Sequence, residues 1–273
     1  MQHLIAHEVK AASTPRSDQD RVNSRIYNAS GVTRYYRSAQ LDHAETMALL
    51  RHQPAFAGRD VLDLGVGTGR TTRFLAPLAR TYVAIDSSPR MIEHMRRWFP
   101  DVAVRPADLR DLSAFSDGAF DFVFGACNVI DGVPHADRLR VLAEVHRVLR
   151  PAGVFAFSSH NRGFRRALSG PSLHWSMNPG TQILHGLRFV RSLVNHARVK
   201  RLRRIEQSYA VLNDEGHDYA ALHYYINRDT QERQLAQTGF RVMDEFDAAG
   251  RLLRDDDDDS ESPMVLYVAA REP

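Results

Sequence analysis

Three glycines follow a short apolar stretch in the segment Asp63-Leu-Gly65-Val-Gly67-Thr-Gly69. Glycines directly after a buried strand let the backbone turn sharply and approach a ligand closely. A helix that starts there also offers unpaired amide groups to an electronegative ligand. The spacing differs from the dinucleotide pattern G-x-G-x-x-G, because the third glycine comes one position early and Arg70 follows it. The segment predicts a ligand-binding turn, and a bare strand-to-helix turn is the alternative.

Two carboxylates follow the next two predicted strands. Asp86 lies 21 positions after Gly65, where it could accept hydrogen bonds from both hydroxyls of a ribose. Asp108 follows the third strand, where it could accept from an adenine amino group. Ligands of open α/β sheets bind beyond the carboxyl ends of the strands, which is where all these residues fall. For Asp86 alone, a role as an ordinary strand cap is an equal alternative.

The elements that must position these residues alternate along the chain. Short apolar strands are predicted at 61–64, 82–85, 102–104, 122–124 and 154–157, and helices at 38–52, 69–79, 88–99 and 139–149. Such alternation with short connections predicts a parallel sheet with right-handed crossovers. A helix at 230–237 and an antiparallel pair of strands at 240–246 and 264–270 complete the chain. We expect an α/β fold with a doubly wound, mostly parallel seven-stranded sheet (Rossmann-like), an antiparallel edge strand and an inserted, mainly helical lid.

The same pattern divides the chain into four parts. Residues 1–30 are polar and are expected to form a flexible N-terminal segment, and residues 31–160 a cofactor-binding core with an N-terminal lid helix. Residues 161–228 are basic and partly helical, which is typical of an inserted substrate or lid region. Residues 229–273 are expected to complete the α/β core.

Composition restricts the kind of protein. Lys and Arg number 36 against 33 Asp and Glu, so the net charge of +3 does not indicate a dedicated nucleic-acid binder. A single cysteine excludes an internal disulfide framework and a multi-cysteine metal site. No stretch approaches the ~20 apolar residues that a membrane helix needs, and no secretory signal is evident, so we expect a cytoplasmic protein without a membrane partner. The acidic run 255–259 is interpreted as a solvated turn, and no metal site is predicted.

Together these features resemble the class I S-adenosylmethionine-dependent methyltransferases over roughly residues 55–160. VLDLGVGTGR resembles the first motif of that family, AIDSSPRMIEHMR the second and PADLRDL the third. FDFVFGACNVID resembles the fourth strand with its loop, and EVHRVLRPAGVFAFS the helix and strand after it, with PAG where many relatives have PGG. The resemblance implies S-adenosylmethionine as the cofactor and S-adenosylhomocysteine as its product.

The resemblance also implies which residues meet the cofactor. Asp63 and the glycines would surround its methionine and ribose part, Asp86 would hold the ribose, and Asp108 the adenine amino group. The full set is Asp63, Gly65, Gly67, Thr68, Gly69, Asp86, Ser87, Met91, Asp108, Leu109 and Cys127. Cys127 is otherwise interpreted as a buried small residue without a recognisable partner.

A methyl group on a sulfonium transfers by in-line displacement, so the protein chiefly aligns the acceptor with the methyl. A base is needed only when the acceptor must lose a proton, and Asp131 is one candidate near the sheet edge. The predicted catalytic residues are His160, Tyr225 and Asn128. The predicted substrate residues are Tyr35, Tyr36, Asn128, His223, Tyr224 and Tyr225. For His160 a capping role is the alternative, and for the tyrosine pairs ordinary packing or a cation–π cage.

The segment after the fourth strand bears on the acceptor class. Nucleic-acid amino-methylases of this fold usually carry an N/D-P-P-Y/F element there, whereas this chain has Gly125-Ala-Cys-Asn-Val. We therefore expect a small-molecule acceptor, methylated on N or O. An RNA methyltransferase that uses the basic 188–204 stretch and a non-catalytic S-adenosylmethionine-binding module are the rivals. The sequence leaves the oligomeric state open, with a homodimer as one option.

Overall fold

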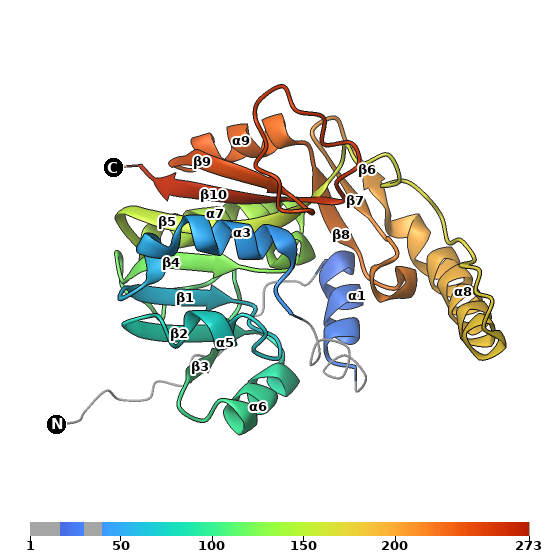
Figure 1. Cartoon of the computed structure of the whole chain (residues 1–273), viewed down its shortest axis with the longest axis horizontal. Coiled ribbons are helices and arrows are strands. Elements are labelled where there is room, and N and C mark those ends of the chain that lie inside the picture. The colour runs from blue at the N-terminus through green and yellow to red at the C-terminus, as the bar shows by residue number, and fades with distance from the viewer. Residues whose placement is uncertain (1–16, 30–39, 273) are drawn as a thin grey trace.

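The computed structural model describes residues 17–29 and 40–272, and the strands in these residues form one ten-stranded sheet (Figure 1). Seven of the ten strands make the expected α/β core. In spatial order they are β3 (Ala103–Pro106), β2 (Thr81–Asp86), β1 (Asp60–Leu64), β4 (Phe120–Gly125), β5 (Leu149–Asn161), β10 (Met264–Arg271) and β9 (Phe240–Asp247).

The pairing of these strands confirms the doubly wound prediction. The pairs β3–β2, β2–β1, β1–β4 and β4–β5 are all parallel. The predicted antiparallel pair is also present, because β10 runs antiparallel to both β5 and β9. The antiparallel strand β10 therefore lies one place inside the edge, and the edge strand on that side is β9.

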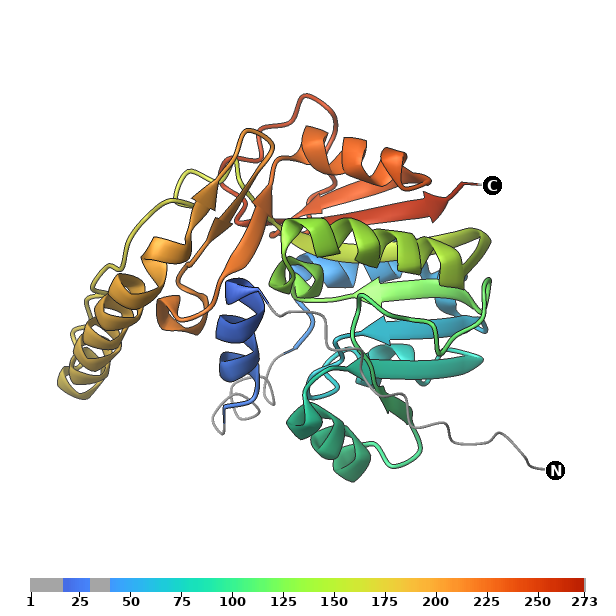
Figure 2. The same ribbon diagram turned by 180° about the vertical axis from the view of Figure 1, so that it is seen from behind.

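Helices cover both faces of the core sheet (Figure 2). One apolar core lies under α7 (His135–Val148) and α9 (Arg228–Gln237), and the other under α3 (His43–Arg51), α4 (Gln53–Phe56), α5 (Thr72–Leu75) and α6 (Pro89–Trp98). The strands β1 and β4 are apolar on both sides because they lie between these two layers.

Two predicted helix boundaries are wrong. The helix expected at 69–79 is only the four-residue α5, because Gly69 has a φ of +80° and the chain is still turning before Thr72. The helix expected from residue 38 begins at His43, where the Asp42 side chain accepts from the Glu45 amide at 2.7 Å and forms a capping box. Ser38, where the predicted helix starts, lies outside the described residues.

The region between β5 and α9 is less helical than expected. It holds the long helix α8 (Pro179–Val199) and two short 3-10 helices, η2 (Lys200–Leu202) and η3 (Gly216–Tyr219). It also holds three strands, β6 (Arg204–Ile205), β7 (Tyr209–Leu212) and β8 (His223–Ile226). Strand β8 pairs in parallel with the end of β5, which sets Tyr225 opposite His160. The prediction missed β8 because it is buried on both faces and lacks polar alternation.

Residues 17–29 do not form the flexible lead-in that the sequence suggested. They contain α1 (Asp18–Tyr27), which starts with a capping box between Ser17 and Asp20. Asn23 pairs with the backbone of Leu222 in both directions, donating at 2.7 Å and accepting at 2.9 Å. Hydrogen bonds from polar side chains to distant backbone thus hold this helix in place. The sequence gives no hydrophobic pattern that would predict the helix.

A buried ion pair joins α7 to the short 3-10 helix η1 (Val129–Gly132). Arg138 and Asp131 are both fully buried and bonded to each other. Arg138 also donates to Ser159 on β5 at 3.0 Å and to Gln231 on α9 at 2.6 Å. One guanidinium therefore ties together four elements.

Along the described ranges 17–29 and 40–272, no helix has the length and apolar character that crossing a bilayer requires.

We expect Arg138→Leu to lower the free energy of unfolding by about 3–5 kcal/mol, because it leaves the carboxylate of Asp131 buried and uncompensated. Urea denaturation followed by circular dichroism measures this change. Arg140→Leu is the matched control, since it makes the same replacement on the exposed side of the same helix. Equal losses in the two variants would contradict the structural importance of the ion pair.

Candidate functional site

A cavity of about 230 Å³ lies beyond the carboxyl ends of β1 to β4. This is the expected place for a ligand in an open α/β sheet. Nine of the eleven predicted cofactor residues line it, namely Gly65, Gly67, Thr68, Asp86, Ser87, Met91, Asp108, Leu109 and Cys127. The remaining two, Asp63 and Gly69, do not line the cavity.

Asp86 fixes the glycine loop from the wall of the cavity. Its carboxylate accepts from the amide of Gly67 at 2.9 Å and from that of Ser88 at 2.8 Å. Burial raises the pKa of Asp86 above its ordinary value, and these amides oppose the rise. A carboxylate offers about four lone-pair positions. Asp86 therefore retains the capacity to accept from ligand hydroxyls while it holds the loop.

Asp63 and Gly69 support the glycine loop on the side away from the cavity. Asp63 is fully buried and accepts from the hydroxyls of Thr71 and Tyr82, and burial raises its pKa to about 6. Its Oδ1 has no hydrogen-bond partner among the described residues. Gly69 packs so closely that an added Cβ would lie 2.4 Å from a ring atom of Phe99. The structure thus gives these two residues packing and bracing contacts at the loop.

The guanidinium of Arg110 binds Asp108, the residue predicted to accept from the adenine amino group. Arg110 donates to the two oxygens of Asp108, from Nε at 2.9 Å and from Nη2 at 2.6 Å. Its third nitrogen lies 2.9 Å from Asp137 and 3.2 Å from Asp20 on α1. Sequence reasoning missed Arg110, although it stands two positions after Asp108 in PADLRDL. Arg110 links α1 to the cavity rim.

Helix α1 provides a cavity wall that the sequence did not predict. The lining residues from this segment are Asp20, Asn23, Ser24, Tyr27 and Asn28. Asn28 accepts from the Ser88 hydroxyl at 2.8 Å, so α1 also contacts the start of α6. Polar residues spaced along a short helix gave no recognisable pattern.

The interpretation of Cys127 as buried and unpartnered is wrong. The residue is exposed, lines the cavity, and its Sγ accepts from Nη2 of Arg70 at 2.8 Å. The same Arg70 is bonded to the buried Glu45 of α3. Because Cys127 follows the end of β4, the loop turns its side chain toward the ligand space and away from the core.

A second group of polar residues, centred on His160, adjoins this cavity at the end of β5. The Oδ2 of Asp131 accepts from both the backbone amide and Nδ1 of His160, each at 2.7 Å. Burial opposes ionisation of Asp131, but Arg138 and His160 outweigh it, so the pKa of Asp131 lies below its ordinary value. The carboxylate therefore holds the proton of His160 on Nδ1 and leaves Nε2 as an acceptor.

Asn128 stands between the two groups. Its Nδ2 lies 3.2 Å from Nε2 of His160, and its neighbours Cys127 and Val129 line the cavity. Both Cys127 and Asn128 have left-handed backbones, with φ of 51° and 54°, which is uncommon outside glycine. The Ser158 hydroxyl accepts from the Asn128 amide at 2.8 Å and helps to hold this conformation. Sites of function often store backbone strain of this kind.

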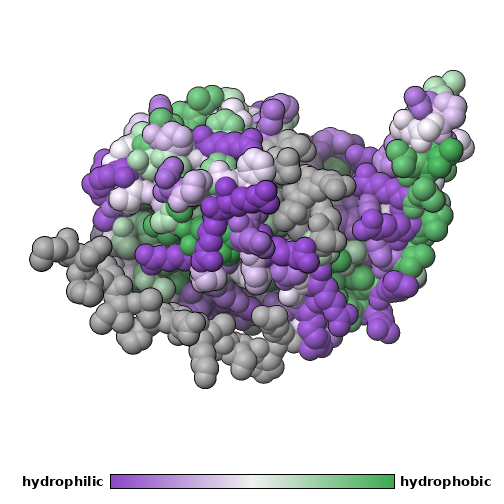
Figure 3. All heavy atoms as spheres, turned by 90° about the horizontal axis from the view of Figure 1, so that it is seen from below, coloured by the Kyte–Doolittle hydropathy of each residue, from purple (hydrophilic) through white to green (hydrophobic). Residues whose placement is uncertain are grey.

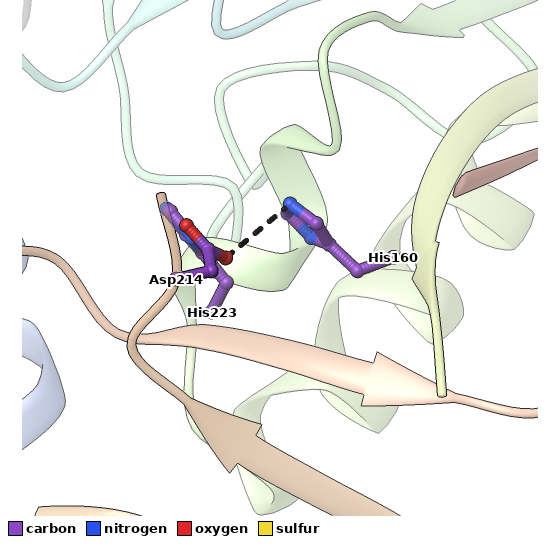
Figure 4. Close-up of side chains that lie close together, drawn as sticks. All are labelled: His160, Asp214 and His223. Carbon is purple, nitrogen blue, oxygen red and sulfur yellow. Dashed lines mark hydrogen bonds and ion pairs between the residues drawn. The ribbon is translucent and has the colours of Figure 1, made fainter. Parts of the chain in front are cut away.

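Asp214 faces Nε2 of His160 across 3.9 Å (Figure 4). It bonds Nδ1 of His223 at 2.8 Å and accepts from the Tyr225 hydroxyl at 2.7 Å. Burial would raise the pKa of Asp214, but His223 reverses this, and Asp214 in turn raises the pKa of His223 against its burial. The two form a buried, hydrogen-bonded carboxylate–histidine pair. Sequence reasoning missed Asp214, because only the pairing of β7 with β8 brings it here.

His160, Asp214 and His223 also offer ligand atoms of the type that binds metals, all within 4.8 Å of one another. Hydrogen bonds already engage these atoms, since Asp214 bonds His223 and Tyr225 while Asn128 lies against His160. The same geometry therefore has a complete explanation as a polar network.

Tyr224, another predicted substrate residue, is not brought into this group. It points to the other face of β8, as alternate residues of a strand must. There it stacks on Tyr209 at 5.0 Å and bonds His135 at 2.8 Å through its hydroxyl. Tyr35 and Tyr36 lie outside the described residues.

Residues 61–153 match the family model of a methyltransferase domain. Malonyl-[acyl-carrier protein] O-methyltransferase of Pectobacterium atrosepticum is 32% identical over 150 residues, which are 54% of this chain and 56% of that protein. A probable S-adenosylmethionine-dependent methyltransferase of Mycolicibacterium smegmatis is 35% identical over 107 residues, 39% of this chain and 40% of that protein. The chain thus spans about half the length of these curated relatives.

Solved structures share the fold over nearly the whole chain. One is 1,6-didemethyltoxoflavin-N1-methyltransferase of Burkholderia thailandensis with bound 1,6-didemethyltoxoflavin and S-adenosylhomocysteine, at a TM-score of 0.59 and 14% identity, covering 98% of this chain and 99% of that one. Another is the CcbJ methyltransferase of Streptomyces caelestis, at a TM-score of 0.60 and 16% identity, covering 91% and 98%. Residues 61–153 are thus similar to a methyltransferase domain, and the fold around them is that of class I S-adenosylmethionine-dependent methyltransferases.

Proposed function

We propose that the chain is an enzyme that transfers the methyl group of S-adenosylmethionine to a nitrogen or oxygen of a small-molecule acceptor. The observation that carries this proposal is the Asp131–His160 pair, whose acceptor nitrogen contacts Asn128 next to the cavity lined by the family motifs. A cofactor pocket alone would suit a binding module equally well. A histidine held in one tautomer beside that pocket adds a group that can accept a proton.

The cavity fits the cofactor in its chemistry. Asp86 can accept from ribose hydroxyls, and the apolar side chains of Met91 and Leu109 suit the two faces of an adenine ring. A side chain at Gly65 would collide with Val129, since its Cβ would lie 2.2 Å from a methyl carbon. The bound cofactor supplies an electrophilic methyl group on a sulfonium, and the leaving thioether needs no proton.

His160 then handles the proton of the acceptor. Its Nε2 accepts the proton as the nitrogen or oxygen of the acceptor attacks, and Asp131 stabilises the imidazolium that results. The Asn128 amide must move aside from Nε2 for this step. Its own Oδ1 is buried without a hydrogen-bond partner in the described chain, so it can accept from the acceptor instead.

Tyr225 is better suited to positioning than to proton removal. Burial is the main cause of its raised pKa, and Asp214 adds to it, so the phenol stays protonated and donates to Asp214. The pair formed by Asp214 and His223 places a carboxylate and an imidazole ring beside His160. A small polar acceptor is therefore the ligand that this space favours.

The choice of a small molecule has one further support. The enzyme of Burkholderia thailandensis, which shares the fold, holds a small heterocycle together with S-adenosylhomocysteine. The two experiments below also test the alternatives. Turnover with RNA would indicate an RNA methyltransferase, and cofactor binding without turnover would indicate a binding module.

The first prediction concerns the cofactor. We expect calorimetric titration to give micromolar affinity for S-adenosylhomocysteine, and Asp86→Ala to weaken it at least about tenfold, because the variant loses the ribose acceptor and the hold on the loop. Asp101→Ala, an exposed aspartate after α6, is the control and should bind normally. A well-folded wild type that binds neither S-adenosylmethionine nor its product would refute the proposed function.

The second prediction concerns proton removal. Release of S-adenosylhomocysteine is measured against a panel of small amines, phenols and carboxylic acids, with bulk tRNA as a separate arm. We expect turnover with a small acceptor, and a fall of about 10²- to 10⁴-fold in His160→Gln, because general-base assistance is lost.

Affinity for S-adenosylhomocysteine should stay unchanged in His160→Gln, since the histidine does not line the cofactor cavity. His43→Gln, an exposed histidine on α3, is the matched control and should retain full turnover. Turnover with tRNA alone would replace the small-molecule acceptor by RNA. Equal activity of both variants with a small acceptor would remove His160 from the chemistry.

A further inference from the structure

The helix α8 projects from the body of the protein and carries an apolar stripe on its outer side. The stripe consists of Ile183, Leu187, Val190 and Val194, whose spacing of four, three and four residues places them on one face. Their relative exposures are 66%, 65%, 58% and 43%. Figure 3 shows the hydrophobic band along this arm. Among the described residues nothing covers it.

The opposite side of α8 is the side that packs. Ser192 is the buried residue of this helix, and it lies about half a turn away from the stripe. Asn195 donates to the backbone of Asp218 in η3 at 2.9 Å, and Arg188 bonds the Asp218 side chain at 2.6 Å. The helix is therefore attached by its polar side, and the apolar side is left outward.

Leu184, next to Ile183, is a further exposed apolar side chain of this helix, at 66%. Trp175 is 82% exposed but lies on the opposite side of α8, because it lines a cavity together with Arg188 and Ser192. Monomeric proteins seldom expose large contiguous apolar patches without a binding role. We call the stripe together with Leu184 the α8 face.

The charge of this region is one-sided. Residues 161–205 contain nine arginines, one lysine and no acidic residue. Arg191 and Arg198 flank the stripe, since each lies four positions after one of its members, and both are exposed, although Arg191 also lies 3.5 Å from the carboxylate of Asp218. Lys200 and Arg201 are exposed just beyond the helix end. The partner of the α8 face must therefore offer both apolar contact and negative charge.

We propose that the α8 face binds peripherally to an anionic phospholipid surface. A second copy of the chain would bring two strongly positive regions together, which like charges oppose. An amphipathic helix with an apolar stripe and with arginine and lysine at its polar flank has the composition that lies in a lipid headgroup layer. This goes beyond the proposed methyl transfer, and it replaces the expectation that no membrane is a partner. The helix lies on the surface and does not cross the bilayer.

The experiment is co-sedimentation of the full chain with vesicles of phosphatidylcholine alone and of equal parts phosphatidylcholine and phosphatidylglycerol. We expect binding to the anionic vesicles at least tenfold stronger than to the neutral ones, and a steep loss as salt rises, because exposed charges are screened.

The test variant is Leu187→Glu with Val190→Glu, which places two carboxylates in the stripe. Its vesicle affinity should fall at least tenfold. Its affinity for S-adenosylhomocysteine should stay normal, and this unchanged affinity shows that the variant is folded. The control is Leu50→Glu, an apolar residue 69% exposed on α3. Because vesicle binding needs no acceptor, this test can fail or succeed independently of the methyl-transfer assay.

Three results would overturn the proposal. Equal or absent binding to both vesicle types would exclude an anionic lipid surface. A dimer by light scattering that the double variant converts to a monomer, without vesicle binding, would assign the face to a second copy. Capture by an acidic protein such as a purified carrier protein, again without vesicle binding, would assign it to a protein partner.

Discussion

The carboxylate of Asp131 is the group on which the polar network around His160 depends. It is fully buried, and Arg138 is the charge that compensates it. The same carboxylate accepts hydrogen bonds from the Ser159 hydroxyl and from the backbone amide and Nδ1 of His160. Removing a charged group from water costs several kcal/mol unless it is paired, so neither partner is stable here alone. Fold and chemistry thus share one ion pair: Arg138 stabilises the core, and Asp131 passes that rigidity on to His160.

Two polar sites meet at α1, and the helix belongs to both. Tyr27 lines the cofactor cavity, and its hydroxyl lies 3.4 Å from Nε2 of His223. Burial raises the pKa of Tyr27, and Asp214 on one side and Asp86 on the other add to the rise. The phenol is therefore neutral between two carboxylates. Few apolar side chains anchor α1, so its position rests on hydrogen bonds from Gln19 and Asn23 and on the fork of Arg110.

The sequence was sufficient where the structural signal is local. Glycines, a strand and a carboxylate at its end lie within a few residues of one another, so the cofactor cavity and the core sheet could be predicted from the chain. Asp214 could not, because it depends on strand pairing between β7 and β8 across a segment expected to be mainly helical. Tyr224 and Tyr225 are neighbours in sequence, yet the pleat sends them to opposite faces. Helix α1 escaped because amide–backbone hydrogen bonds leave no hydrophobic periodicity.

The position of α1 in the cavity wall makes the helix a sensor of occupancy. A ligand that touches both the glycine loop and α1 binds the docked helix more tightly than the undocked one. By reciprocity, that ligand shifts the helix toward the docked state by the same factor. Tyr27 contacts His223 as well as the cavity, so docking of α1 also sets the surroundings of His223. Backbone amides of α1 should accordingly exchange hydrogen more slowly when the cavity is filled.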